Sequence, residues 1–100
     1  MPNRPAVTVR ALKAGDTAAM RSLNALFGAE FEDPDAYGAA PPDDAWLARL
    51  LAKDDFFALV AECEARIVGG LTAYELVKFE QARSDIYIYD LAVARSHRRR

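Results

Sequence analysis

Alternating polarity predicts β-strands at both ends of the chain. Residues 7–13 alternate between apolar and polar side chains, and residues 84–93 are rich in β-branched and aromatic side chains. Because successive side chains of a strand point to opposite faces, strict alternation divides the second stretch into Ile86, Ile88, Asp90 and Ala92 on one face and Tyr87, Tyr89, Leu91 and Val93 on the other. A carboxylate therefore interrupts an otherwise apolar face.

Helical spacing predicts a first helix after the opening strand. Asp16 is a suitable N-cap, apolar residues recur at helical intervals from Ala19 to Phe27, and Gly28 occupies the position typical of a helix C-terminus. Proline and glycine then make a loop or a short turn of helix the expectation for residues 29–42. The acids of this segment fit either a site for a polycation or a solvated loop: Glu30, Glu32, Asp33 and Asp35.

A second helix and a pair of strands follow. Asp43 or Asp44 is expected to cap the helix, whose apolar face is Trp46, Leu47, Leu50 and Leu51. Residues 56–61 are almost continuously apolar and predict a strand buried on both faces. After a turn at 63–66, residues 67–76 predict its partner, in which Gly69 and Gly70 suggest a bulge or a close backbone approach.

The order of these elements predicts an α+β fold. One strand, two helices and three strands follow one another, and the short links between the last three strands favour an antiparallel meander. The length of 100 residues allows one domain. Many α+β domains share this order, so the order does not identify a family.

Composition narrows the class of protein and of partner. No apolar run is long enough to cross a membrane, and the single cysteine fits a reducing compartment, which predicts a cytoplasmic protein. No spacing predicts a metal site. Four of the thirteen basic residues lie within residues 95–100, so the rest of the chain is clearly acidic. An acidic body favours a cationic small molecule over nucleic acid, although acids that only solvate the surface would give the same composition.

One long stretch carries a specific resemblance. Residues 78–93, together with His97-Arg98-Arg99, resemble the small aminoglycoside 3-N-acetyltransferases of the gentamicin-resistance type, which belong to the GNAT superfamily. Residues 26–31 and 73–76 are similar to the same group, and the likeness covers most of residues 20–100. The resemblance implies a GNAT-type fold and acetyl transfer from acetyl-CoA to the 3-amino group of a 2-deoxystreptamine antibiotic.

The same resemblance implies that residues 1–100 are the N-terminal part of an N-acetyltransferase domain. In the family, an Arg/Gln-x-x-Gly-x-Gly/Ala loop binds phosphate, and Arg98 would be its first residue. The first glycine would then follow Arg100. We therefore expect the domain to be incomplete at its C-terminus, with a mixed sheet completed by residues beyond the chain end.

The resemblance also assigns residues to CoA. Leu91, Ala92 and Val93 would offer backbone groups to the pantetheine arm, with one N–H near Val93 facing the thioester carbonyl. Because helix N-termini and arginines favour anions, Arg98, Arg99 and Arg100 would bind the pyrophosphate. The alternative for this basic run is a solvated or nucleic-acid-binding tail.

Asp90 is the candidate catalytic residue, because an acceptor amine arrives as an ammonium and must lose a proton before it attacks. Its alternative role is purely structural, bonding loop amides or pairing with an arginine. The residues expected to bind substrate are Tyr74, Glu75, Glu80, Asp85 and Asp90. A homodimer is possible in principle. Two rival functions remain open, namely a GNAT enzyme for polyamines or another small amine, and a non-enzymatic α+β binding module with a basic tail.

Overall fold

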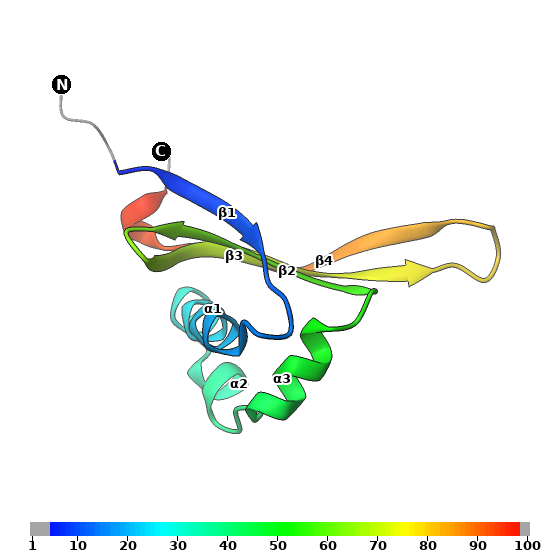
Figure 1. Ribbon diagram of the computed structural model, residues 1–100, viewed down its shortest axis with the longest axis horizontal. Coiled ribbons are helices and arrows are strands. Elements are labelled where there is room, and N and C mark those ends of the chain that lie inside the picture. The colour runs from blue at the N-terminus through cyan, green and yellow to red at the C-terminus, as the bar shows by residue number, and fades with distance from the viewer. Residues whose placement is uncertain (1–4, 99–100) are drawn as a thin grey trace.

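A four-stranded antiparallel sheet, with helices on one face, forms the body of the protein. The computed structural model describes residues 5–98, and its strand order is β1-β2-β3-β4. The strands are β1 (Val7–Ala11), β2 (Phe56–Cys63), β3 (Arg66–Val77) and β4 (Ser84–Val93). All three α-helices lie on the same side of the sheet, α1 (Thr17–Glu30), α2 (Pro34–Gly38) and α3 (Asp44–Leu51) (Figure 1). The predicted α+β order and the antiparallel meander are therefore confirmed.

The β3–β4 hairpin extends beyond the helices, and a single-turn 3₁₀ helix, η1 (Arg95–His97), follows β4 (Figure 1). The outer part of the hairpin has no helix packed against it among residues 5–98, and several of its apolar side chains are exposed. None of the helices in this described range is long and apolar enough to cross a membrane.

Helix α1 does not end at Gly28 as predicted. It continues to Glu30, and Gly28 is a buried residue of its interior. A Cβ atom at this position would lie 3.2 Å from the Cβ of Tyr37 on α2. The glycine therefore serves close packing between two helices, and Glu32, with φ of 54°, takes the left-handed conformation after the helix.

Two predictions of burial are also corrected. Strand β2 alternates, with Phe56, Ala58 and Val60 buried and Phe57 exposed, because helices cover only one face of the described sheet. Asp43 caps α3 by accepting from the N–H of Trp46 at 2.9 Å. Leu47 and Leu51, two residues of the predicted apolar face of this helix, are buried. The Trp46 side chain, however, is 55% exposed.

The close backbone approach predicted for the two glycines of β3 is confirmed. A Cβ atom at Gly70 would lie 2.5 Å from the carbonyl oxygen of Leu59 and 2.6 Å from Cδ1 of Leu23. Leu23 is fully buried at the centre of the core, together with Phe27, Leu47 and Val60. The absence of a side chain at Gly70 thus allows α1 to pack closely on the sheet.

A bulge in β4 overturns the strict alternation expected for residues 84–93. Asp90 pairs with Thr72, but Ala73 pairs with Ile88, so Tyr89 has no partner residue on β3. Such an extra residue reverses which side chains face the core on either side of it. Ile86 and Ile88 therefore lie on the face away from the helices, opposite to the face of Asp90 and Ala92.

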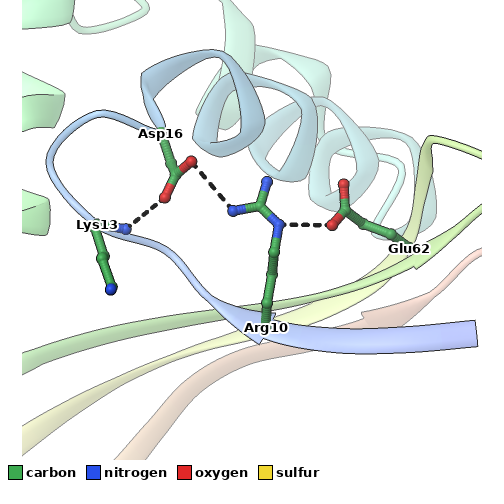
Figure 2. A network of polar contacts seen from close by, with 4 residues as sticks. All are labelled: Arg10, Lys13, Asp16 and Glu62. Carbon is green, nitrogen blue, oxygen red and sulfur yellow. Dashed lines mark hydrogen bonds and ion pairs between the residues drawn. The ribbon is translucent and has the colours of Figure 1, made fainter.

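A network of polar contacts joins β1, β2 and the start of α1 (Figure 2). Arg10 donates from Nε to Glu62 Oε1 at 2.6 Å and from Nη1 to Asp16 Oδ1 at 3.1 Å. Asp16 Oδ2 accepts from the backbone N–H of Lys13 at 2.8 Å. Asp16 stands at the predicted N-cap position, yet its side chain makes no capping bond. It fixes the turn before the helix instead.

We expect Asp16→Asn to destabilise the fold at neutral pH and to have little effect in acid. The Lys13 N–H and then Arg10 hold the pKa of the Asp16 carboxyl below its ordinary value of 3.8. A lowered pKa in the folded state stabilises it above the ordinary pKa, and this contribution is lost as pH falls through the folded-state pKa. Thermal unfolding of both proteins at neutral and acidic pH measures the difference. Asp54→Asn, which alters an acid of the exposed α3–β2 turn, is the control, and an equal effect of Asp16→Asn at both pH values would contradict the prediction.

Candidate active site

Asp90 and Tyr37 meet where the β4 bulge faces α1 and α2. The hydroxyl of Tyr37 donates to Oδ2 of Asp90 at 2.9 Å, in a partly buried position. Asp90 comes directly after the bulged residue Tyr89, opposite Thr72, whose side chain is buried. The bulge therefore turns the Asp90 carboxylate to the helix side of the sheet.

Two adjoining cavities surround this pair. A cavity of about 160 Å³ is bounded by Asp90, Tyr74 and Tyr89 of the sheet and by apolar side chains of α1 and α3. A larger cavity of about 480 Å³ lies between α1 and α2, where the ring of Tyr37 forms part of its wall. Asn24 and Pro42 line both cavities. We call the two cavities together the recess; Asp90 lines the smaller of them and Tyr37 the larger.

The tyrosines around Asp90 are donors rather than bases. Burial, followed by the bond to the Asp90 carboxylate, raises the pKa of Tyr37 to about 12. Burial also raises the pKa of Tyr74, and the nearby Tyr89 and Asp90 add to this effect. Both phenols are therefore protonated at neutral pH. Asp90 is the single carboxylate among the residues that line the smaller cavity, so it is the group there suited to accept a proton.

Aromatic rings support the wall of this cavity. The ring of Tyr74 lies 5.0 Å from that of Phe56 in the core and 5.8 Å from that of Tyr89. Tyr87 pairs with Tyr74 across the strands, and its ring lies 6.4 Å from Tyr89. The bulge thus brings Tyr87 and Tyr89 to the face that Asp90 shares with Tyr74, whereas strict alternation in β4 would have put them on the opposite face.

The structure brings only some of the predicted substrate residues together. Tyr74 and Asp90 line the same cavity. Glu75 lies on the opposite face of β3 from Tyr74 and accepts a hydrogen bond from Ser84 Oγ at 2.6 Å. Glu80 in the β3–β4 connection forms an ion pair with Lys78, with 3.9 Å between Oε2 and Nζ. Asp85 forms one with Arg83, with 3.4 Å between Oδ1 and Nη1. Roles for these three acids in substrate binding stay predictions.

The predicted CoA-binding residues lie at the end of β4 and after it. Strand β4 is an edge strand of the described sheet, so one side of the backbone at Leu91, Ala92 and Val93 faces no other strand within residues 5–98. Arg98 donates from Nε to the carbonyl oxygen of Val93 at 3.0 Å and forms an ion pair with Glu30. Arg99 and Arg100 lie outside the described residues.

Tyr37 and Asn24 are site residues that sequence reasoning missed. The Asp33-Pro34 pair was a usable signal for a short helix, since Asp33 accepts from the N–H of Ala36 and Pro34 stands in the first turn. Nothing in the local pattern, however, connects Tyr37 with a carboxylate 53 residues later. Within residues 5–98, no group of three or more His, Cys, Asp or Glu side chains is arranged to hold a metal ion.

Comparison with known proteins agrees with this architecture. The model of the acetyltransferase (GNAT) family matches residues 20–100. The chain is similar to the crystal structure of an aminoglycoside acetyltransferase, HMB0005, from an uncultured soil metagenomic sample, with 52% identity and a TM-score of 0.91 over 95% of this chain. The similarity covers 62% of that protein, so the chain spans less than two thirds of its relative.

Two further structures show the same fold. An aminoglycoside acetyltransferase from a soil metagenomic sample, meta-AAC0020, crystallised with sisomicin, is 35% identical with a TM-score of 0.81, over 93% of this chain and 59% of that chain. The aminoglycoside N-acetyltransferase AAC(6')-Iy, in complex with CoA, is 18% identical with a TM-score of 0.68, over 100% of this chain and 63% of that chain. Among curated proteins there is no match.

Proposed function

Because the chain belongs to the acetyltransferase (GNAT) family, we propose that it is part of an acetyl-CoA-dependent N-acetyltransferase that acts on aminoglycosides. Support comes from the 52% identity to one aminoglycoside acetyltransferase and the 35% identity to another, which was crystallised with sisomicin. The described sheet and helices would supply the acceptor side of the site and the strand that meets CoA.

The observation that carries the proposal is the Asp90 carboxylate, which lines the smaller cavity of the recess. An aminoglycoside is a polycation, and a partly buried carboxylate is stabilised by an ammonium partner. Asp90 would orient the acceptor ammonium and take its proton, directly or through a water molecule, before the nitrogen attacks the thioester carbonyl. The protonated phenols of Tyr37 and Tyr74 would line the approach.

The open backbone edge of β4 is suited to binding acetyl-CoA, the acyl donor. The Ala94 N–H donates to the Val68 carbonyl of β3, so by alternation along the strand Leu91 and Val93 direct their backbone groups to the side that no described strand covers. An extended pantetheine arm requires such an open backbone edge. An N–H near Val93 would polarise the thioester carbonyl, and a preorganised donor of this kind is worth roughly 3 kcal/mol of barrier. Acetyl-CoA would supply the activated acetyl group, and the chain would position the amine against it.

We further propose the 3-amino group of the 2-deoxystreptamine ring as the acetylated position. This finer assignment rests on the resemblance of residues 78–93 to the gentamicin-resistance enzymes, and the geometry of the recess alone does not select one amine. The rival acceptor class is a linear polyamine, for which one carboxylate and an apolar recess would also suffice.

Acetyl transfer by the complete protein, measured with a panel of amines, tests the proposal. The panel contains a gentamicin-type aminoglycoside, an aminoglycoside whose 3-amino group is already acetylated, and spermidine. We expect turnover with the first compound only, and NMR of the product locates the new amide. Preference for spermidine would favour the rival enzyme, and an absence of CoA binding and of turnover with every amine would favour the non-enzymatic module.

Arg98→Ala provides a separate test of the CoA side. If the guanidinium contacts phosphate, we expect KM for acetyl-CoA to rise roughly tenfold, since a hydrogen bond to a charged group is worth about 1.5 kcal/mol or more. The antibiotic KM should change less, and the effect should shrink at high salt.

Glu30→Gln is the matched control for Arg98→Ala, because it breaks the Arg98–Glu30 ion pair while leaving the guanidinium in place. The same rise in the acetyl-CoA KM in both variants would assign Arg98 a structural role through Glu30. An unchanged KM for acetyl-CoA in Arg98→Ala would indicate that the basic run is a solvated tail.

A further inference from the structure

We propose that Tyr37 is a positioning residue for the reaction: its hydroxyl fixes one oxygen of the Asp90 carboxylate and thereby presents the other oxygen to the acceptor ammonium. This inference rests on the proposed acetyl transfer. It assigns a function to Tyr37, a residue of the segment between α1 and α3. In the sequence, this segment is far from β4, the strand that contains Asp90.

The Tyr37 ring is held firmly enough to act as a positioning group. It packs against Phe27 of α1 at 6.0 Å and against Phe31, the residue that follows α1, at 6.1 Å between ring centres. Gly28 lets the backbone of α2 approach this closely, since a Cβ there would come within 3.2 Å of the Tyr37 Cβ. Asp33 fixes the first turn of α2 by accepting from the Ala36 N–H. The hydroxyl therefore has a defined place.

The two oxygens of Asp90 have different surroundings. Oδ2 accepts from the Tyr37 hydroxyl at 2.9 Å, whereas Oδ1 accepts no hydrogen bond from the described residues. In the described part of the chain, every fully buried side-chain nitrogen or oxygen has a hydrogen-bond partner. Because Oδ1 has no partner, it is not fully buried and is reachable from outside. The carboxylate thus has one anchored oxygen and one open oxygen.

This division suits proton transfer from an ammonium. Before the attack, an N–H bond of the ammonium breaks and an O–H bond forms at Oδ1, or at a water molecule held there, while the Tyr37 proton stays on the phenol. The neutral amine then bonds to the thioester carbon, the C–S bond breaks, and the CoA thiolate leaves and takes up the second proton that the nitrogen loses. The neighbouring Tyr74 is not equivalent, because its hydroxyl donates no hydrogen bond to Asp90 and its ring packs on Phe56 and Tyr89. Among the tyrosines near Asp90, Tyr37 is therefore the one that orients the carboxylate.

A double-mutant cycle in the complete protein tests the role, with Tyr37→Phe, Asp90→Asn and the double variant. Phenylalanine keeps the ring packing and removes only the hydroxyl. We expect Tyr37→Phe to lower kcat for the aminoglycoside about tenfold, as the loss of a hydrogen bond to a charged group would, and to leave KM for acetyl-CoA unchanged. In the Asp90→Asn background it should have almost no further effect. Thr8→Val, which removes a hydroxyl from the exposed strand β1, should retain wild-type rates.

Equal losses from Tyr37→Phe in both backgrounds would overturn the positioning role, because they would show an effect that does not pass through Asp90. Wild-type kcat in Tyr37→Phe would overturn it as well. A wild-type protein that acetylates no amine would instead overturn the proposed function. As a readout independent of activity, carbon-13 NMR of the tyrosine ring should show that Asp90→Asn lowers the pKa of Tyr37, and an unchanged pKa would show that the two groups are not in contact.

Discussion

Asp90→Asn is expected to lower kcat/KM for gentamicin-type acceptors by about 10²-fold or more, the usual range for loss of a general base. Asparagine keeps the shape of the side chain and can still accept from the Tyr37 hydroxyl, but it carries no charge and takes no proton. The acceptor ammonium would therefore lose both its partner and its base. KM for acetyl-CoA should change little, because the proposed CoA contacts use the backbone after Asp90.

Steady-state kinetics across pH, with both substrates varied, measures this effect. Asp54→Asn, which alters an exposed acid of the α3–β2 turn, should keep wild-type values. Retention of wild-type kcat/KM in Asp90→Asn would remove Asp90 from the chemistry. If the variant lost activity because it unfolded, which thermal unfolding would reveal, Asp90 would be structural. The base would then be sought at Glu75, at Glu80 or beyond the described residues.

Gly70→Ala is expected to destabilise the fold strongly, by about 2–4 kcal/mol, a range reached when a side chain is forced into a filled core. The new Cβ would lie 2.5 Å from the Leu59 carbonyl oxygen, a backbone atom of the neighbouring strand that cannot move without disturbing the β2–β3 ladder. It would also press on Leu23, which is fully buried. Urea-induced unfolding followed by circular dichroism measures the loss.

Gly15→Ala is the matched control, since a Cβ at that position would meet no atom within 4 Å. It changes the same atoms of the same residue type at the exposed turn before α1. Similar unfolding midpoints for Gly70→Ala and Gly15→Ala would show that α1 does not seat on the sheet through Gly70. A loss confined to Gly70→Ala would confirm that it does.

Local signals in the sequence were enough for most of the fold. Alternation and turn residues predicted the meander, and Glu64 and Ala65 adopt the left-handed conformations of the tight turn expected between β2 and β3. Gly28 was misread because a glycine at the end of a helical pattern can serve either a cap or close packing. Only the position of Tyr37, which no local pattern gives, decides between the two.

The candidate site was less accessible to sequence reasoning. Asp90 could be proposed from its place before the Leu91–Val93 segment, and Tyr74 from the resembling string around it. Tyr89 could not be proposed, because the bulge at this residue changes which side chains share the face of Asp90. A bulge depends on the pairing between two strands and leaves no clear mark in one of them. The contact with Tyr37 depends in turn on how α2 packs on α1, which is a tertiary property.

Because α2 is so short, the local folding of residues 33–38 depends on the charge of Asp90. Five residues are too few for a helix that is stable by itself, since isolated helices of fewer than roughly 12 residues are marginal in water. Its local unfolding is therefore opposed mainly by the Asp33 cap, the ring packing of Tyr37 and the bond to Asp90. By thermodynamic linkage, whatever neutralises or engages Asp90 also shifts the opening equilibrium of residues 33–38. Occupancy of the recess and the local folding of its wall are thus one coupled equilibrium.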